Sequence, residues 1–216
     1  MQTADVREQM IEQQVRAWDV LDERVLDVMR QVPRELFVPA GYGYLAYADL
    51  EVPLPRGQHM LRPSVAGRLL QALLPAPDEP VLEIGAGTGF VTACLRAMSA
   101  QVRSLEVFAE LADAARRNLA ELGMRDVEVA DADVFSVESG ARCGAIAVTG
   151  SLPQYDARFE RMLSLGGRLF VVVGEAPVME ARLVRRTAED AWATQSLFET
   201  VIDPLVSAAR PPRFTF

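Results

Sequence analysis

The stretch VLEIGAGTGF, residues 81–90, decides the fold of this 216-residue chain. Its first four residues are mostly apolar, as expected of a short strand buried on both faces of a sheet. Glycines at positions 85, 87 and 89 follow, and they let the backbone turn sharply and let another group approach it closely. A helical pattern then extends from about residue 89 to residue 98. The stretch predicts one strand–turn–helix unit of a parallel sheet.

The same alternation of strands and helices continues downstream. Residues 181–201 show the pattern typical of antiparallel strands. Strands that alternate with helices form a mostly parallel sheet with helices on both faces, so the fold class is α/β and doubly wound. The further strands are predicted at 101–106, 126–131, 145–150 and 167–174, and the further helices at about 109–122 and around 155–163.

The chain before this unit has a different pattern. Residues 4–32 have helical spacing in two segments, with a break at 19–22 and Asp22 as the expected N-cap of the second segment. Another helix is predicted from Ser64 to just before Pro75. These segments predict a helical part of the chain that precedes the first strand–turn–helix unit.

A long irregular segment joins the two parts. Residues 39–63 are rich in Gly, Pro and Tyr, with a short strand predicted near 50–54. A loop of this length inside a compact domain is usually functional. We call residues 39–63 the covering loop. The chain is then divided into an N-terminal helical segment with this loop, 1–63, and a core, 64–216, within one structural domain overall.

Composition restricts the possible functions. The formal net charge is −8, and all 22 basic residues are arginines scattered along the chain. Tight binding to nucleic acid needs a concentrated basic face, so no nucleic-acid partner is expected. Cys94 and Cys143 have no CxxC spacing, which indicates a reducing compartment and no metal site. The N-terminus lacks an apolar signal segment and the apolar runs are too short for a bilayer, so we expect a cytoplasmic protein without membrane contact.

The glycine turn and two nearby acids indicate a ligand. Ligands of such sheets bind at the carboxyl ends of the strands, and Glu106 at the end of the next strand suits a ribose diol. The spacing is GxGxG rather than the GxGxxG of dinucleotide sites, which disfavours a nicotinamide-dependent oxidoreductase. Glu83 lies two residues before the turn, where it is expected to face the ligand and to repel a pyrophosphate. A cationic sulfonium nucleoside, S-adenosylmethionine, fits this arrangement better.

Asp133 follows the third strand, where the adenine ring of such a ligand is expected. Its carboxylate is suited to accept a hydrogen bond from the adenine amino group, and Ala132 and Val134 would form an apolar wall. The alternative is that Asp133 only caps a turn.

These residues resemble those of class I S-adenosylmethionine-dependent methyltransferases. Longer segments resemble one family in particular, the protein-L-isoaspartate O-methyltransferases, which methylate the α-carboxylate of isoaspartyl residues in damaged proteins. The resemblance implies a seven-stranded Rossmann-like sheet, S-adenosyl-L-methionine as the cofactor with S-adenosyl-L-homocysteine as its product, and a protein or peptide substrate. It rests on residues 10–39, LAYADLEVPLPRGQ at 45–58, the 81–90 turn, AIAVTGSLP at 145–153 and LGGRLFVVVGE at 165–175.

The resemblance also implies which residues bind the cofactor. The segment 57–63 would close over the methionine end of the cofactor and over the substrate. The candidate cofactor contacts are Gln58, His59, Met60, Glu83, Gly85, Ala86, Gly87, Gly89, Glu106, Val107, Ala132, Asp133, Val134 and Thr149.

The covering loop departs from the family's pattern. The family usually has Thr-Ile-Ser where this chain has His59-Met60-Leu61, so Leu61 replaces a serine thought to contact the reacting carboxylate. A second departure is Gly144, where the family often has an aspartate. Methylation of an ionised carboxylate needs alignment and desolvation rather than a general base. His59 or Arg62 could supply the missing donor, so the candidate substrate-orienting residues are His59, Leu61 and Arg62.

Alternative interpretations remain at this stage. His59 could be an ordinary loop histidine, and Met60 and Leu61 could form only an apolar lid. The changed loop also leaves open a methyltransferase of the same fold with a different acceptor, or a relative that binds the cofactor without catalysis. We expect a monomer or weak dimer.

Overall fold

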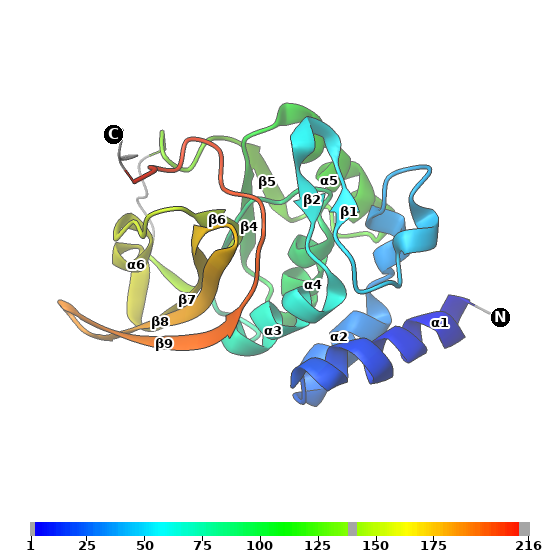
Figure 1. The fold of residues 1–216 in the computed structure, drawn as a ribbon, viewed down its shortest axis with the longest axis horizontal. Coiled ribbons are helices and arrows are strands. Elements are labelled where there is room, and N and C mark those ends of the chain that lie inside the picture. Colours follow the sequence, from blue (N-terminus) through cyan, green and yellow to red (C-terminus); the bar gives the residue numbers. More distant parts are fainter. Residues whose placement is uncertain (1–2, 138–141, 212–216) are drawn as a thin grey trace.

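The computed structural model describes residues 3–137 and 142–211, and within them a seven-stranded sheet forms the centre of the molecule (Figure 1). The strand order is β5-β4-β3-β6-β7-β8-β9. The first five strands in this order are parallel, whereas β8 and β9 continue the sheet as antiparallel neighbours. The strands are β3 Val81–Ile84, β4 Val102–Glu106, β5 Glu128–Asp131, β6 Cys143–Leu152, β7 Leu163–Glu175, β8 Val178–Ala188 and β9 Ala191–Glu199.

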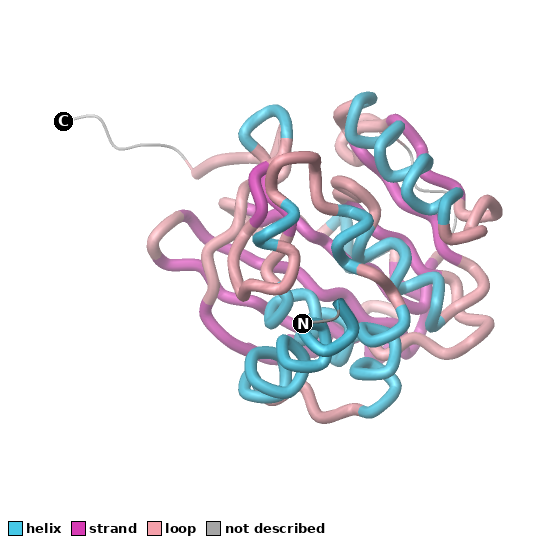
Figure 2. The backbone as a smooth tube through the Cα atoms, turned by 90° about the vertical axis from the view of Figure 1, so that its right-hand side faces the viewer, coloured by secondary structure: helices cyan, strands magenta, loops and turns pink. Residues whose placement is uncertain are grey.

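Helices and loops cover the two faces of this sheet (Figure 2). Val81 of β3 belongs to the larger buried cluster, which includes side chains from α1 to α5, and its neighbour Leu82 belongs to a second cluster with Phe159 of α6. Successive side chains of a strand point to opposite faces, so the two clusters lie on opposite sides of the sheet. The helices are α1 Thr3–Met10, α2 Glu23–Gln31, α3 Pro63–Leu73, α4 Phe90–Met98, α5 Ala109–Glu121 and α6 Arg158–Arg161.

The N-terminal helices are separated near the predicted break at 19–22. After α1 the chain continues through a π-helical turn, Ile11–Val15, and a 3-10 turn, Arg16–Trp18. The left-handed backbone of Asp19, with φ 58°, then ends the first segment. The Asp22 side chain accepts a hydrogen bond from the Arg24 backbone N–H and caps α2, as predicted.

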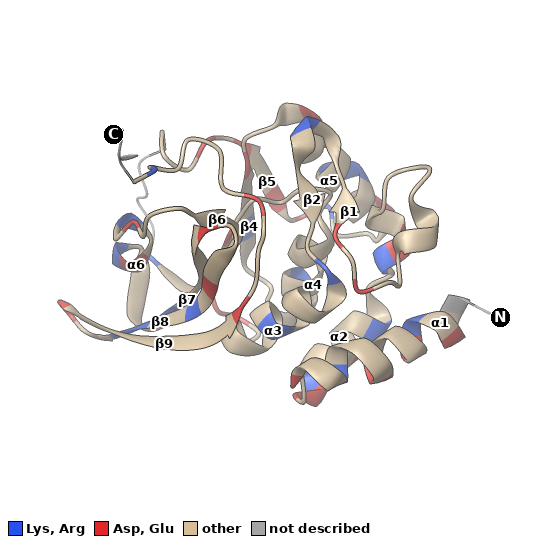
Figure 3. Ribbon diagram, viewed as in Figure 1, with Lys and Arg blue, Asp and Glu red and all other residues tan. Residues whose placement is uncertain are grey.

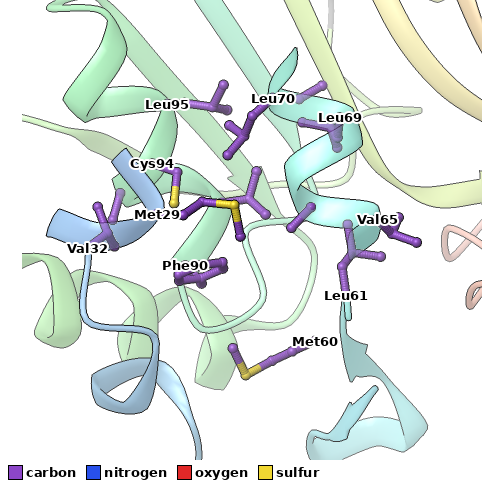
Figure 4. Packing of buried hydrophobic residues seen from close by; sticks show 14 of the residues in the cluster. Met29, Val32, Met60, Leu61, Val65, Leu69, Leu70, Phe90, Cys94 and Leu95 are labelled. Carbon is purple, nitrogen blue, oxygen red and sulfur yellow. The ribbon is translucent and has the colours of Figure 1, made fainter. Parts of the chain in front are cut away.

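The long loop folds into a small hairpin that lies apart from the main sheet. β1 Val52–Pro53 pairs antiparallel with β2 His59–Met60, so the short strand predicted near 50–54 is confirmed and a second short strand joins it. Met60 and Leu61 are buried with Phe90 and Val65 in the larger cluster, which fixes the end of β2 over α3 and α4 (Figure 4).

One predicted helix is much shorter than expected. The helix predicted around 155–163 is only the single turn α6, and Leu163 already begins β7 and is fully buried. The apolar residues of this segment fit a helical pattern and a strand start equally well, and pairing of Leu163 with Cys143 decides in favour of the strand.

The order of the strands places a crevice next to the glycine turn. The chain proceeds from β3 outward to β4 and β5, and then returns to the other side of β3 with β6. Thr149 joins β6 to the end of β3 at this point. Its Oγ1 lies within hydrogen-bonding distance of the carbonyl oxygens of Ile84, at 2.9 Å, and Gly85, at 2.5 Å. Ligands of doubly wound sheets bind at such a switch point.

Candidate functional site

A cavity lies at the carboxyl ends of β3, β4 and β6. We call it the main cavity. It brings together most of the candidate cofactor contacts from segments far apart in the sequence, namely Gln58, His59, Met60, Gly85, Gly87, Glu106, Val107, Ala132, Asp133, Val134 and Thr149.

The glycine turn forms one wall of this cavity. Gly85 has a φ of 96°, and a Cβ atom added there would lie 2.4 Å from Thr149 Oγ1. Gly87 also has a positive φ, 54°, and lies within reach of Leu54 in the covering loop. The positive φ favours glycine at both positions, the contact with Thr149 requires it at Gly85, and both residues line the cavity with backbone alone.

Glu106 ends β4 at the edge of the main cavity. Its carboxylate accepts hydrogen bonds from the backbone N–H groups of Gly87, at 2.8 Å, and Phe108, at 3.0 Å. Burial raises the pKa of the Glu106 carboxyl group, and these N–H groups and that of Val107 oppose the rise. Each oxygen accepts one of the two hydrogen bonds from Gly87 and Phe108 and can accept further bonds, so the carboxylate can receive two hydroxyl donors.

Glu83 does not face the main cavity, contrary to the sequence-based expectation. Its side chain is 0% exposed, and its Oε2 accepts hydrogen bonds of 2.5 Å from the hydroxyls of Thr92 and Ser104. β3 is buried on both faces, and Glu83 points to the face that carries α4. Burial raises the pKa of this carboxyl group to about 7.

Gly89 also lies outside the main cavity. A Cβ atom added there would lie 3.2 Å from both Cα and Cβ of Ala115, so this glycine lets α4 and α5 approach closely. Its φ of 95° at the N-cap of α4 adds a second reason for glycine. The structure thus gives Gly89 a packing role rather than a position against a ligand.

Asp133 combines both interpretations considered from the sequence. Its Oδ1 accepts a hydrogen bond of 2.8 Å from the Phe135 backbone N–H, so it caps a turn, and the residue also lines the main cavity. Ala132 and the buried Val134 line the cavity beside it.

His59 lies where three hollows meet. It lines the main cavity and an inner pocket beneath the covering loop. It also lines an open outer groove, whose other walls include Asp49, Pro53, Arg62 and Thr200. Its Nδ1 lies 2.8 Å from Oδ2 of Asp203, a residue of the segment after β9. Nothing in the local sequence marks Asp203, because only the return of the chain past Ser151 brings it to the site.

The other two candidate substrate-orienting residues occupy different places. Leu61 is 8% exposed and lines both the main cavity and the inner pocket. Arg62 lines only the outer groove, where its Nη2 donates to Thr200 Oγ1 at 3.0 Å and its guanidinium lies over the Trp18 ring. Of the three, only His59 is a polar side chain at the main cavity.

Glu51 brings a further carboxyl group to the junction of the main cavity and the outer groove. Burial raises its pKa, and the nearby Asp203 carboxylate adds to this rise, whereas His59 and Arg62 oppose it.

The inner pocket is lined by a buried arginine that no local sequence pattern marks. Arg34, which follows α2, lines it together with Thr88 and Phe90, and so does Ala86, one of the candidate cofactor contacts. Gly85 and Gly87 line both this pocket and the main cavity, so the two hollows adjoin each other across the glycine turn.

Comparison with known proteins gives the chain its family. The family model for protein-L-isoaspartate(D-aspartate) O-methyltransferases matches residues 5–210. The chain belongs to this family. The match includes both the helical segment with its covering loop and the whole sheet, so family membership does not rest on the glycine turn alone.

Individual members of the protein-L-isoaspartate O-methyltransferase family are similar along most of their length. The enzyme from Rhodopseudomonas palustris is 39% identical over 202 residues, which cover 92% of each chain. The enzyme from Koribacter versatilis is 38% identical over 183 residues, which cover 84% of this chain and 82% of the relative.

A solved structure shares the fold. It is that of a Plasmodium falciparum protein assigned to the protein-L-isoaspartate O-methyltransferases, in complex with S-adenosyl-L-homocysteine. The TM-score is 0.81 at 18% identity, over 92% of this chain and 97% of the other.

Among residues 3–137 and 142–211, no helix has the length and apolar character needed to span a membrane. No group of three or more His, Cys, Asp or Glu side chains in the same residues is arranged to hold a metal ion. Arginines and acidic residues alternate on α1 and α2 (Figure 3), where they form surface ion pairs such as Arg30 with Glu8.

Proposed function

We propose that this chain is an S-adenosylmethionine-dependent methyltransferase that esterifies the α-carboxylate of isoaspartyl residues in proteins or peptides. The observation that carries the proposal is the arrangement around Glu106. Its carboxylate is tied to the glycine turn through Gly87 and faces a cavity that also contains Asp133.

The residues of the main cavity fit the cofactor. Glu106 offers acceptors for the two ribose hydroxyls, and Ala132 with Val134 offers an apolar surface for the adenine ring beside the Asp133 carboxylate. The turn at Gly85 and Gly87 leaves bare backbone for the rest of the molecule. When bound, S-adenosylmethionine supplies the electrophilic methyl group.

The chain's own contribution to the reaction is positional. The acceptor carboxylate is already ionised at neutral pH, so no side chain has to remove a proton from it. What is needed is alignment and exclusion of water, and the buried Leu61 and Met60 provide an apolar cover next to His59. His59 and Arg62 are the polar groups that can orient a carboxylate arriving along the outer groove.

The direct test is transfer of a radiolabelled methyl group to a peptide that contains one isoaspartyl residue. The matched control is the same peptide with a normal aspartyl residue at that position. We expect a base-labile methyl ester on the isoaspartyl peptide and none on the control. Absence of transfer to the isoaspartyl peptide, with the cofactor shown to bind, would contradict the proposed acceptor.

One observation favours a second acceptor class. If the proton of the His59 ring is on Nδ1, it is donated to Asp203, and Nε2 is then free to accept a proton. Such a pair suits an acceptor with a neutral hydroxyl group, which must lose its proton on methylation. A peptide carrying serine and tyrosine in place of the isoaspartyl residue tests this alternative in the same assay, and we expect no label on it.

A further inference from the structure

Arg34 is a buried arginine with an unused donor. Its side chain is 1% exposed, its Nε donates to the carbonyl oxygen of Ala46 at 3.1 Å, and its Nη2 donates to that of Leu61 at 2.8 Å. The guanidinium lies over the Phe90 ring, 4.8 Å from its centroid. Nη1 is buried and has no hydrogen-bond partner in the described part of the chain.

Arg34 also has no ion-pair partner among the described residues. Both of its hydrogen bonds go to backbone carbonyls, and no carboxylate of residues 3–137 or 142–211 forms an ion pair with it. Burial lowers the pKa of the guanidinium to about 10, although Asp49 and Cys94 oppose this shift. A buried cation without a partner is costly for a folded protein, so an anion that occupies the adjacent space would be bound strongly.

The inner pocket next to Arg34 offers further donors. Thr88 lines this pocket, and its buried Oγ1 also lacks a partner in the described structure. Phe90 and Val91 begin the nine-residue helix α4, whose first N–H groups have no partner within the helix and carry the positive end of its dipole. An unpaired guanidinium, a free hydroxyl and a helix N-terminus together form a site for a carboxylate.

We propose that Arg34 and Thr88 bind the carboxylate at the amino-acid end of S-adenosylmethionine. This inference rests on the proposed function, because it places the nucleoside end of the cofactor at Glu106 and Asp133. Gly85 and Gly87 line both the main cavity and the inner pocket, so a ligand that leaves the ribose site along the glycine turn enters the space lined by Arg34. The acceptor carboxylate belongs to a large molecule and has the outer groove as its open approach.

The test compares two ligands that differ in one group. S-Adenosyl-L-homocysteine and its decarboxylated analogue, S-adenosyl-3-thiopropylamine, are titrated into wild type, Arg34→Gln and Arg34→Lys by calorimetry. We expect Arg34→Gln to bind the homocysteine ligand about 10- to 100-fold more weakly, with the affinity for the decarboxylated ligand nearly unchanged. Arg34→Lys keeps the charge and should lie between the two. Arg96→Gln is the matched control, because it removes a partly buried arginine of α4 whose ion-pair partner is the exposed Asp126.

The comparison separates ligand binding from a structural effect. Loss of the bonds to Ala46 and Leu61 in Arg34→Gln can loosen the covering loop, but this would weaken both ligands equally. An equal loss for both ligands therefore overturns the inference. So does unchanged homocysteine binding with a raised KM for the isoaspartyl peptide, which would assign Arg34 to the acceptor carboxylate. If neither ligand binds the wild type, the proposed cofactor site itself is wrong.

Discussion

The backbone N–H of Gly87 donates a hydrogen bond of 2.8 Å to the Glu106 carboxylate, and this bond joins the glycine turn after β3 to the end of β4. The Glu106 carboxylate thus stabilises the glycine turn and also offers hydrogen-bond acceptors to a ligand. The second oxygen is held by Phe108 N–H in the same way. The carboxylate is therefore preorganised before any ligand arrives.

Replacement of Glu106 by glutamine tests this dual role. The amide has only one acceptor oxygen, and its NH₂ group would face an N–H donor of Gly87 or Phe108. We expect the affinity for S-adenosyl-L-homocysteine to fall about 10- to 100-fold in calorimetry. Glu128→Gln, which removes an exposed carboxylate on the neighbouring strand β5, should bind like wild type. Equal affinities for Glu106→Gln and wild type would show that Glu106 does not contact the ligand.

Gly85→Ala tests the close approach of the turn to Thr149. The new Cβ would lie 2.4 Å from Thr149 Oγ1. We therefore expect the free energy of unfolding, measured by urea titration, to fall by about 3 kcal/mol. We also expect cofactor binding to be lost. Gly41→Ala is a matched control, because Gly41 has nearly the same φ, 95°, and nothing within 4 Å of the added atom. It should cost only about 1 kcal/mol. Similar losses for both variants would mean that backbone strain alone, and not the contact with Thr149, requires glycine at 85.

Glu83 makes the stability of the protein depend on pH. Burial raises its pKa from the ordinary value of 4.5 to about 7, so the folded protein binds a proton that the unfolded chain releases within this range. The contribution of Glu83 to the free energy of unfolding then falls as the pH rises from about 4.5 to about 7. Glu83→Gln stays neutral, and its stability relative to wild type should grow by about 3 kcal/mol over this window. Urea titrations at several pH values measure this difference, and a constant difference would rule out a protonated Glu83.

His59→Ala tests the polar side chain at the junction of the three hollows. We expect kcat/KM for the isoaspartyl peptide to fall about 10- to 100-fold, because one charge-assisted contact to the acceptor is lost. Asp203→Asn should cause a smaller loss, since it removes only the negative charge of the carboxylate that lies 2.8 Å from the ring. Steady-state methyl transfer measures both, and an unchanged rate in His59→Ala would leave this histidine without a role in the reaction.

The sheet and the nucleoside end of the site could be predicted because their signals are local. The glycine turn, Glu106 and Asp133 each follow a recognisable strand, and the carboxyl ends of parallel strands meet at one edge. The orientation of Glu83 cannot be predicted, because β3 is buried on both faces and the pattern of its residues does not reveal which side chain points to the ligand. The role of Gly89 cannot be predicted either, since glycine spacing does not distinguish close packing from close approach to a ligand.

The surroundings of Arg34 and His59 depend on contacts between residues that are far apart in the sequence. Arg34 lies about 50 residues before the glycine turn, and nothing near it in the sequence shows that its guanidinium is buried beside Phe90. Asp203 reaches His59 only because the segment after β9 returns along Ser151 of β6. In both cases long-range packing, rather than local pattern, decides which polar groups meet.

The most direct test of the whole account is a calorimetric titration of the wild-type protein with S-adenosyl-L-homocysteine, with NAD as the comparison ligand. We expect saturable binding of one molecule of S-adenosyl-L-homocysteine per chain and no binding of NAD. Absence of heat and of thermal stabilisation with S-adenosyl-L-homocysteine would contradict the assignment of the Glu106 cavity to a sulfonium nucleoside, and with it the proposed chemistry.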